Sequence, residues 1–218
     1  MLLLRFALYE DRISPGGAVE YLTPGSSRLL FCLQGSAGLG DGRSISVQEA
    51  ALAHGNTYVN TGHDGALLWR WELFEDDQEP EMDPMGVTSR LVNEQTVGFE
   101  EGEDILFRCE SLGMPPADEI EQMRLFGPAI HVCMAGGFQT LHGTDVAQMK
   151  PQGAWFINGG ETFDLEAHNK EPSMLLRAVI LPPVLAGETS QIIPEDQIKP
   201  KDGKKRFEKI HTEGIVAL

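Results

Sequence analysis

Three residues in the second half of the chain, Glu121, His131 and Cys133, have side chains that could perform acid–base, nucleophilic or metal chemistry. His131 and Cys133 are two positions apart in an apolar run, and residues two apart share one face of a β-strand. A carboxylate, an imidazole and a thiolate can bind zinc or iron, or can serve as an acid–base group beside a nucleophile. However, a buried cysteine more often behaves as a small hydrophobic residue, and a single strand histidine is more often a hydrogen-bonded core residue. Both interpretations stay open at this stage.

The segment that carries Cys133 is the second copy of an internal repeat. A matching segment surrounds Cys32, 101 positions earlier in the chain. The same offset holds over a long stretch and pairs Pro15 with Pro116, Glu20 with Glu121, Gly35 with Gly136 and Gly42 with Gly143. A period of this length is far too long for a solenoid repeat, so we expect each copy to form a small domain.

Short apolar runs separated by clusters of Gly, Pro, Asp and Ser predict an all-β chain. The predicted strands of the first copy are residues 3–8, 18–22, 29–34, 44–47, 50–53 and 66–74. Those of the second copy are residues 105–110, 120–125, 130–134, 146–149, 154–157, 162–166 and 174–181. We therefore expect domains at 1–78 and 104–184, joined by an acidic linker with a short helix at 79–103 and followed by a polar tail at 185–218.

Composition limits the classes of partner. The net charge of −16 repels phosphate backbones and anionic membrane surfaces, so we expect neither a nucleic acid nor a membrane as partner. The apolar start lacks a basic segment and is typical of a strand, not of a signal peptide. No run approaches the ~20 apolar residues of a membrane span. Three cysteines in apolar strands argue against a disulfide scaffold and predict a cytoplasmic protein.

The order of strands and turns adds a family resemblance. The block from Lys150 to Phe163, KPQGAWFINGGETF, follows a strand that ends in glycine and a glycine turn, and residues 48–58 are a weaker version of it. This order resembles the second motif of the cupin superfamily, in which a Gly-Asp turn leads into a strand, a Pro-x-Gly turn and a histidine. Over residues 2–74 and 104–182 the chain is similar to a two-domain cupin, or bicupin, of the RmlC-like type. The resemblance implies two tandem double-stranded β-helix (jelly-roll) barrels.

The resemblance also implies where a metal would bind. A typical cupin binds a divalent metal through a His-x-His pair, a glutamate and a final histidine. These positions fall on Leu22, Pro24, Arg28 and Tyr58 in the first copy, and on Met123, Leu125, Ala129 and Phe163 in the second. Of these eight residues only Tyr58 is of a type that binds metal ions in proteins, and tyrosine does so rarely. The chain contains no His-x-His sequence. We therefore expect degenerate motifs and no cofactor, with zinc, iron, manganese or nickel at an atypical site as the alternative.

In the family the glutamate points into the barrel, which implies that residues two and four positions further along point inward as well. The inward residues are then Arg28, Leu30 and Cys32 in the first barrel, and Ala129, His131 and Cys133 in the second. The preceding segment would add Glu20 and Leu22, or Glu121 and Met123, so that Glu121, His131 and Cys133 converge. An inward Arg28 could bind an anionic ligand, pair with Glu20 or lie at the rim.

Three functions compete. The first is a protein that binds a small organic molecule in a barrel pocket without the usual metal. Its expected pocket residues are Glu20, Leu22, Arg28, Cys32, Tyr58, Met123 and Phe163, because apolar and aromatic replacements favour an organic ligand. The second is a cupin-type isomerase, lyase or dioxygenase with a non-standard metal or acid–base site in the C-terminal barrel. The third is a structural module, with homodimers formed through the barrel faces.

Overall fold

The computed structural model describes residues 1–198 and 204–218, and most of them lie in antiparallel strands. The chain divides into two compact units, Met1–Glu103 with Val216–Leu218, and Asp104–Ile215. Among the described residues the helices are two short 3-10 turns, η1 (Pro183–Leu185) and η2 (Glu195–Gln197). The all-β prediction is therefore confirmed. No helix in the described part of the chain is long and apolar enough to span a membrane.

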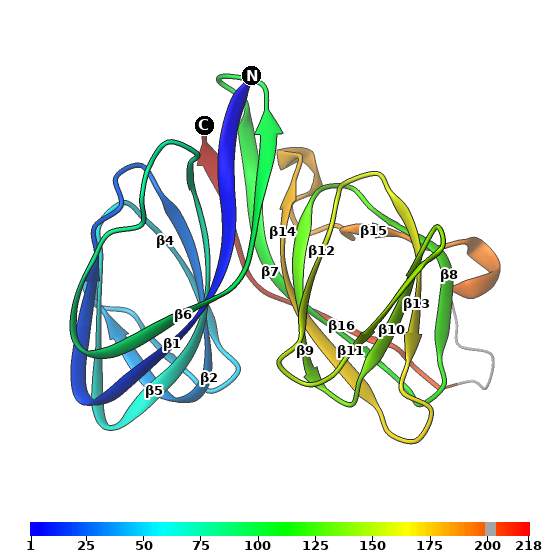
Figure 1. The fold of residues 1–218 in the computed structure, drawn as a ribbon, viewed down its shortest axis with the longest axis horizontal. Helices are drawn as coiled ribbons and strands as arrows, with labels where there is room; N and C mark the ends of the chain where they lie inside the picture. The colour runs from blue at the N-terminus through cyan, green and yellow to red at the C-terminus, as the bar shows by residue number, and fades with distance from the viewer. Residues whose placement is uncertain (199–203) are drawn as a thin grey trace. The chain divides into compact units, whose positions relative to one another are not determined.

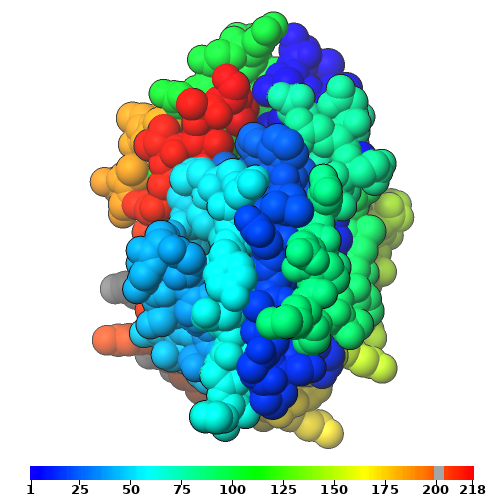
Figure 2. All heavy atoms as spheres, turned by 90° about the vertical axis from the view of Figure 1, so that its left-hand side faces the viewer, coloured from blue at the N-terminus to red at the C-terminus, as the bar shows by residue number. Residues whose placement is uncertain are grey.

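The first unit is built on long, bent strands (Figure 1). Its elements are β1 (Leu2–Tyr21), β2 (Ser27–Leu39), β3 (Ser44–Ser46), β4 (Ala50–His54), β5 (Thr57–Glu75) and β6 (Met82–Phe99). They pair in the order β3-β2-β5-β1-β6, with β4 also on β2. Figure 2 shows β5, β1 and β6 side by side on the surface, in cyan, blue and green. The register of β1 shifts between Ile13 and Ala18, so the segment 14–17, which separates the predicted strands 3–8 and 18–22, is a bulge within one long strand.

The second unit has two five-stranded sheets. Its first strands are β7 (Asp104–Met114), β8 (Glu119–Leu125), β9 (Ala129–Ala135), β10 (Phe138–His142) and β11 (Asp145–Met149). The later strands are β12 (Ala154–Ile157), β13 (Thr162–Ala167), β14 (Ser173–Leu181), β15 (Gln191–Ile192) and β16 (Phe207–Ala217). One sheet has the order β11-β10-β13-β8-β15 and the other β12-β9-β14-β7-β16. By the repeat offset, β7 with β8 corresponds to β1, and β9 with β10 corresponds to β2.

Two expected connections differ from the structure. The segment 79–103, expected as a linker with a short helix, contains β6, which pairs with β1 along nearly its whole length. Its valines and threonines favour a strand, and the edge of β1 supplies backbone partners. The segment expected as a polar tail supplies β15 on β8 and β16 on β7. These two strands take the place in the second unit that β6 has in the first. Residues 199–203, part of the basic cluster in that tail, lie outside the described residues.

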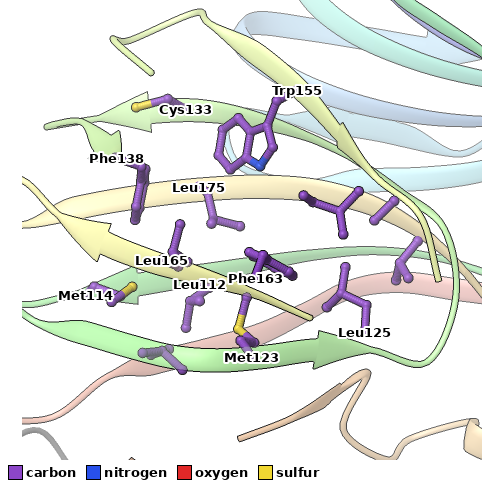
Figure 3. Close-up of a cluster of buried hydrophobic side chains, with 14 of the residues drawn as sticks. Leu112, Met114, Met123, Leu125, Cys133, Phe138, Trp155, Phe163, Leu165 and Leu175 are labelled. Carbon is purple, nitrogen blue, oxygen red and sulfur yellow. The ribbon is translucent and has the colours of Figure 1, made fainter. Parts of the chain in front are cut away.

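Each unit has its own hydrophobic core. In the first unit Leu30, Cys32 and Leu68 are among its members, and in the second Cys133, Phe163 and Leu175 are. Figure 3 shows the second core, with the rings of Trp155 and Phe163 directed into the interior between the two sheets. The inward positions expected for Ala129 and Cys133 agree with this core.

Candidate functional site in the second barrel

A line of polar and aromatic side chains crosses the inner face of the second barrel. Arg177 on β14 is the cross-strand partner of Glu110 on β7 and of His131 on β9, and His131 is the partner of Trp155 on β12. Directly opposed residues of antiparallel strands project from the same face. Leu175, two positions from Arg177 on β14, belongs to the hydrophobic core, so this face is the inner one. We call Glu110, Arg177, His131 and Trp155 the polar row.

His131 is the central residue of the polar row, with 1% of its surface exposed. Its ring stacks on Trp155, with ring centroids 4.8 Å apart and an interplanar angle of 11°. The ring of Phe163 meets it edge-on at 6.5 Å. Burial and then the charge of Arg177 hold the pKa of His131 well below its usual value, against a smaller opposite effect of backbone hydrogen bonds at Trp155 and Ala129. The imidazole is therefore neutral, with one nitrogen that donates and one that accepts.

The polar row concentrates unpaired polar atoms. Within residues 1–198 and 204–218, no hydrogen bond of good geometry is made by Nδ1 and Nε2 of His131, Nε1 of Trp155 or Nη1 of Arg177, although backbone groups of Trp155 and Ala129 contact the His131 ring. Buried polar groups are nearly always hydrogen-bonded, and one left unpaired costs about 1–3 kcal/mol. Four such atoms on adjacent strands of one apolar interior mark a place where the polar atoms of a ligand would be stabilised.

The rest of Arg177 is fixed by hydrogen bonds. Its Nε donates to Glu110 Oε1 at 2.6 Å, and its Nη2 donates to Ser190 Oγ at 2.8 Å and Gln191 Oε1 at 2.9 Å. Burial opposes ionisation of Glu110, but Arg177, the Ser190 hydroxyl and Arg108 together lower the pKa of this carboxyl group. The structure therefore presents an ionised Glu110 and a rigid guanidinium with one free edge.

A cavity of about 320 Å³ reaches the polar row. Glu110, Arg177 and Ser190 line it, together with Glu188, Thr189 and Glu208 from the segment before β15 and from β16. We call it the Arg177 cavity. It connects the buried end of Arg177 with residues that are exposed to solvent, such as Glu188 and Glu208.

Glu121 does not join His131 and Cys133, so the expected trio is wrong. Gln122 has a positive φ of 55°, and the pairing of β8 with β13 shifts register at this point. The extra residue turns both Glu121 and Gln122 outward, where they are exposed, while Ile120 and Met123 are buried on either side. A bulge of this kind reverses the alternation from which the sequence prediction was made.

Cys133 is inside the barrel, as expected, but its environment disfavours reactivity. Burial raises the pKa of its thiol to about 11, and the thiol contacts the carbonyl oxygen of Ala135 at 3.5 Å. A nucleophilic cysteine needs a lowered pKa and usually a charged neighbour. His131 cannot supply that charge, because it is neutral. Cys133 therefore acts as a core side chain.

In the first barrel Arg28 is fully buried, as expected for an inward residue, but its partner is Glu72 and not Glu20. The Arg28–Glu72 pair measures 2.7 Å, and the guanidinium lies over the ring of Tyr21. The network extends through Arg70, which pairs with Glu72 and, at 2.8 Å, with Asp11. Two arginines and two carboxylates thus balance their charges inside this barrel.

Of the residues expected to line a pocket in the first barrel, Glu20 and Tyr58 line a cavity of about 450 Å³, but this cavity opens on the outer surface and does not include Leu22, Arg28 or Cys32. Glu20 and Tyr58 are cross-strand neighbours, but both are exposed, because the inward positions are Tyr21 and Thr57. Leu22 is only partly buried. Of the remaining expected pocket residues, Arg28 and Cys32 lie inside the first barrel, and Met123 and Phe163 lie in the core of the second.

Sequence reasoning identified Arg28 but missed Arg70 in the first barrel and Arg177 in the second. Arg70 and Arg177 occupy matching places in the similar closing strands of the two copies, and each is a charged residue within an apolar run. A charged residue at the same place in both apolar strands was the sequence feature that could have identified the two arginines. Trp155 was not predicted as a site residue, because it contacts His131 only through the pairing of β12 with β9.

The family's usual metal does not fit this chain. Met123, Leu125, Ala129 and Phe163 are parts of an apolar core, and Arg28 brings a positive charge to the place of a carboxylate. Among the described residues no group of three or more histidine, cysteine, aspartate or glutamate side chains is placed to hold a metal ion. Hard and borderline cations require such donors.

Comparisons with known proteins support the fold. No family model and no curated protein sequence matches the chain. Oxalate decarboxylase from Lactobacillus farciminis, in a formate complex, matches with a TM-score of 0.62 and 12% identity over 87% of this chain and 80% of its own. A mutant of Bacillus subtilis oxalate decarboxylase matches with a TM-score of 0.60 and 9% identity, over 86% and 71%. The Bacillus enzyme has Mn(II) centres. At these identities the likeness concerns the fold alone, and the strand arrangement is that of tandem cupin jelly-roll barrels.

Proposed function

We propose that the second barrel binds a small polar organic molecule without a metal ion. The observation that carries the proposal is the set of unpaired atoms of His131, Trp155 and Arg177, which belong to adjacent strands of one inner face. These atoms lost their hydrogen bonds to water on folding, and the described residues do not replace those bonds. A ligand that forms hydrogen bonds with them would therefore be stabilised in the barrel. The rings of His131, Trp155 and Phe163 add apolar surface for its carbon skeleton.

The Arg177 cavity is the proposed entrance. Its volume of about 320 Å³ is at the small end of ligand pockets, which favours a compact molecule. Arg177 both lines this cavity and neighbours His131 across the strands β14 and β9. Its inner wall is formed by Arg177 and Glu110, and the rings of His131 and Trp155 are not part of its lining.

The enzyme alternative has less support. Of its three candidate residues Glu121, His131 and Cys133, Glu121 is exposed on the outer side of β8. The pKa of the Cys133 thiol is raised to about 11, and the pKa of His131 is lowered well below its usual value, so neither is poised near neutral pH. The polar row is better arranged for recognition than for proton transfer or nucleophilic attack.

Native mass spectrometry and elemental analysis of the full chain, purified without chelator, test the proposal. We expect a retained low-mass organic compound, no stoichiometric metal, and loss of the compound in His131→Leu. This variant introduces the residue that the first copy has at the matching position, Leu30. His142→Leu, at an exposed histidine, is the control. Stoichiometric metal that disappears in His131→Leu, or retention that survives the substitution, would overturn the proposal.

A further inference from the structure

A second cavity of the second unit is larger than the Arg177 cavity and mostly apolar. Its volume is about 830 Å³, and its apolar side chains are Phe126 from the turn between β8 and β9, Ile192 of β15, Ile193, and Ile198 at the end of η2. We call it the isoleucine groove. Phe126, Ile192 and Ile198 are 42%, 37% and 59% exposed. A single exposed apolar side chain is ordinary, but several gathered around one hollow are typical of a binding site.

The walls of the isoleucine groove are fixed by hydrogen bonds. The backbone N–H of Phe126 donates to the carbonyl oxygen of Ser190 at 3.0 Å, which holds the β8–β9 turn against the segment before β15. Arg206, which is also in the lining, donates to both carboxylate oxygens of Asp118 at 2.6 and 2.9 Å and to the carbonyl oxygen of Gln197 in η2. The groove is therefore formed before a ligand arrives, which lowers the entropic cost of binding.

One side of the isoleucine groove carries positive charge. Lys204, Lys205 and Arg206 line it, in a chain whose 33 acidic residues outnumber its 17 basic ones. The carboxylate of Glu208, the acidic residue of the lining, accepts a hydrogen bond from Nε2 of Gln191 at 2.6 Å. Lys205 is exposed, and within the part of the chain that the structure describes no hydrogen bond or ion pair engages its ammonium group. This ammonium group is therefore free to bind an anion at the edge of an apolar surface.

We infer that the isoleucine groove binds an amphipathic anion with a single alkyl chain, a medium- or long-chain carboxylate. The alkyl chain packs against Phe126, Ile192 and Ile198, and the carboxylate lies beside Lys205. Removal of the chain and of these exposed side chains from water drives binding, and the charge of Lys205 sets the orientation of the ligand.

This site is separate from the polar row and goes beyond the proposed function. Thr189 and Glu208 line both the isoleucine groove and the Arg177 cavity, but no residue of the polar row lines the groove. A membrane surface is a less suitable occupant than a free carboxylate, because the net charge of −16 repels anionic bilayers from the chain as a whole.

Calorimetric titration of the full chain with three probes, each below its micelle concentration, tests the inference. Decanoate has an alkyl chain and an anionic head group, decyltrimethylammonium has a similar chain with a cationic head group, and acetate has the anionic head group without the chain. We expect decanoate to bind with one-to-one stoichiometry and with a Kd about tenfold or more below the values for the other two probes.

Two exposed positions of the isoleucine groove supply variants that should leave the fold unchanged. Lys205→Glu reverses the charge at the head-group site, and Ile198→Asn removes apolar surface from the groove. Each substitution should raise the Kd of decanoate about tenfold. Lys150→Glu and Val146→Asn are the matched controls, because both residues are exposed in the same unit but lie outside the groove, and they should leave the Kd nearly unchanged.

Each alternative outcome overturns a stated part of the inference. Equal binding of decanoate and decyltrimethylammonium would refute the anionic head group. Equal effects of Lys205→Glu and Lys150→Glu, or of Ile198→Asn and Val146→Asn, would refute the location. If decanoate does not bind, the inference fails, and binding to phosphatidylglycerol vesicles that Ile198→Asn abolishes would assign the groove to a membrane surface instead. A carboxylate retained in the groove is distinguished from a ligand of the polar row by its mass and by its retention in His131→Leu, so either proposal can fail without the other.

Discussion

His131 and Trp155 stack ring on ring inside the second barrel, with centroids 4.8 Å apart and planes within 11° of parallel, and among the described residues neither ring makes a side-chain hydrogen bond of good geometry. In the first barrel the position that matches His131 is Leu30, and its cross-strand partner is Ala51. The same fold therefore forms with an apolar pair at this place. The polar pair is not required by the architecture, which is why we assign it to ligand recognition.

Replacement of His131 by leucine should leave the protein as stable or make it more stable. The substitution removes two buried nitrogens that make no hydrogen bond of good geometry, whose desolvation costs about 1–3 kcal/mol, and it forfeits a stacking contact worth about 0.5–1.5 kcal/mol. We expect the free energy of unfolding in urea to rise by about 1 kcal/mol. A loss of similar size would show instead that His131 is a satisfied core residue.

The wild type and His131→Leu should also differ in how their stability depends on pH. The pKa of His131 is well below its ordinary 6.5 in the folded state, so below pH 6.5 the unfolded chain binds a proton that the folded chain does not. The stability of the wild type should therefore fall, relative to His131→Leu, by up to about 1.4 kcal/mol per pH unit as the pH drops from 6.5 towards the folded pKa. Above pH 6.5 the difference should be constant. Urea unfolding of both proteins at pH 7.5 and pH 5.5 measures it, and parallel pH profiles would contradict a buried neutral imidazole.

The second barrel shows what the sequence could and could not specify. The family resemblance together with strand alternation predicted inward positions for Ala129 and Cys133, and both lie in the core. Glu121 was misplaced because the bulge at Gln122 depends on backbone geometry that no residue type in this segment announces. A positive φ at glutamine is uncommon, so pattern reasoning assigns such a residue to regular strand.

Arg28 should be essential to the stability of the first barrel. Its guanidinium is fully buried and pairs with the buried Glu72, so removal of one partner leaves a charge only partly compensated by Arg70. We expect Arg28→Met to lower the free energy of unfolding by about 3 kcal/mol or more. Arg43, whose pair with Asp41 is half exposed, supplies the control, and Arg43→Met should change little. Equal effects of the two substitutions would refute the buried network.

The partner of Arg28 lay beyond sequence reasoning for a topological reason. Glu72 is far along the chain and meets Arg28 only because β2 and β5 pair in register. Glu20 is much nearer in sequence, but it faces outward from β1. The missed strands β15 and β16 have a similar cause, since their polar segments become strands by pairing with β8 and β7. Local composition does not encode such partnerships.

The three cysteines should be unreactive in the folded protein. Burial is the largest influence on each, raising the pKa of Cys133 to about 11 and raising the pKa of Cys32 and Cys109 as well. At pH 8 the thiolate fraction is therefore small, and we expect slow reaction with an aromatic disulfide reagent until urea unfolds the chain. In the unfolded protein all three thiols should react, releasing three equivalents of the reagent's aromatic thiolate per chain, and this value is the internal standard. Rapid reaction of one thiol in the native protein, abolished by Cys133→Ser, would restore Cys133 as a candidate nucleophile.

The repeated glycines should divide into two energetic classes. Gly136 has a φ of 68°, and a Cβ at this position would lie 2.6 Å from the carbonyl oxygen of Pro172 and 2.9 Å from Cα of Ser173. Gly143 has a φ of 61° but open space around its Cα. Alanine in this left-handed region costs about 1–2 kcal/mol through backbone strain alone, which is the expected effect of Gly143→Ala.

Gly136→Ala adds a clash with backbone atoms that cannot rotate away, so its loss of unfolding free energy should exceed that of Gly143→Ala by more than the error of a urea titration. The same contrast is expected between Gly35, where a Cβ would overlap the carbonyl oxygen of Gly65, and Gly42, which has open space. If the two alanine substitutions of each pair lower the unfolding free energy equally, both copies retain these glycines only for their positive backbone angle φ. If the first member of each pair loses more, the close approach between strands is what both copies of the barrel preserve.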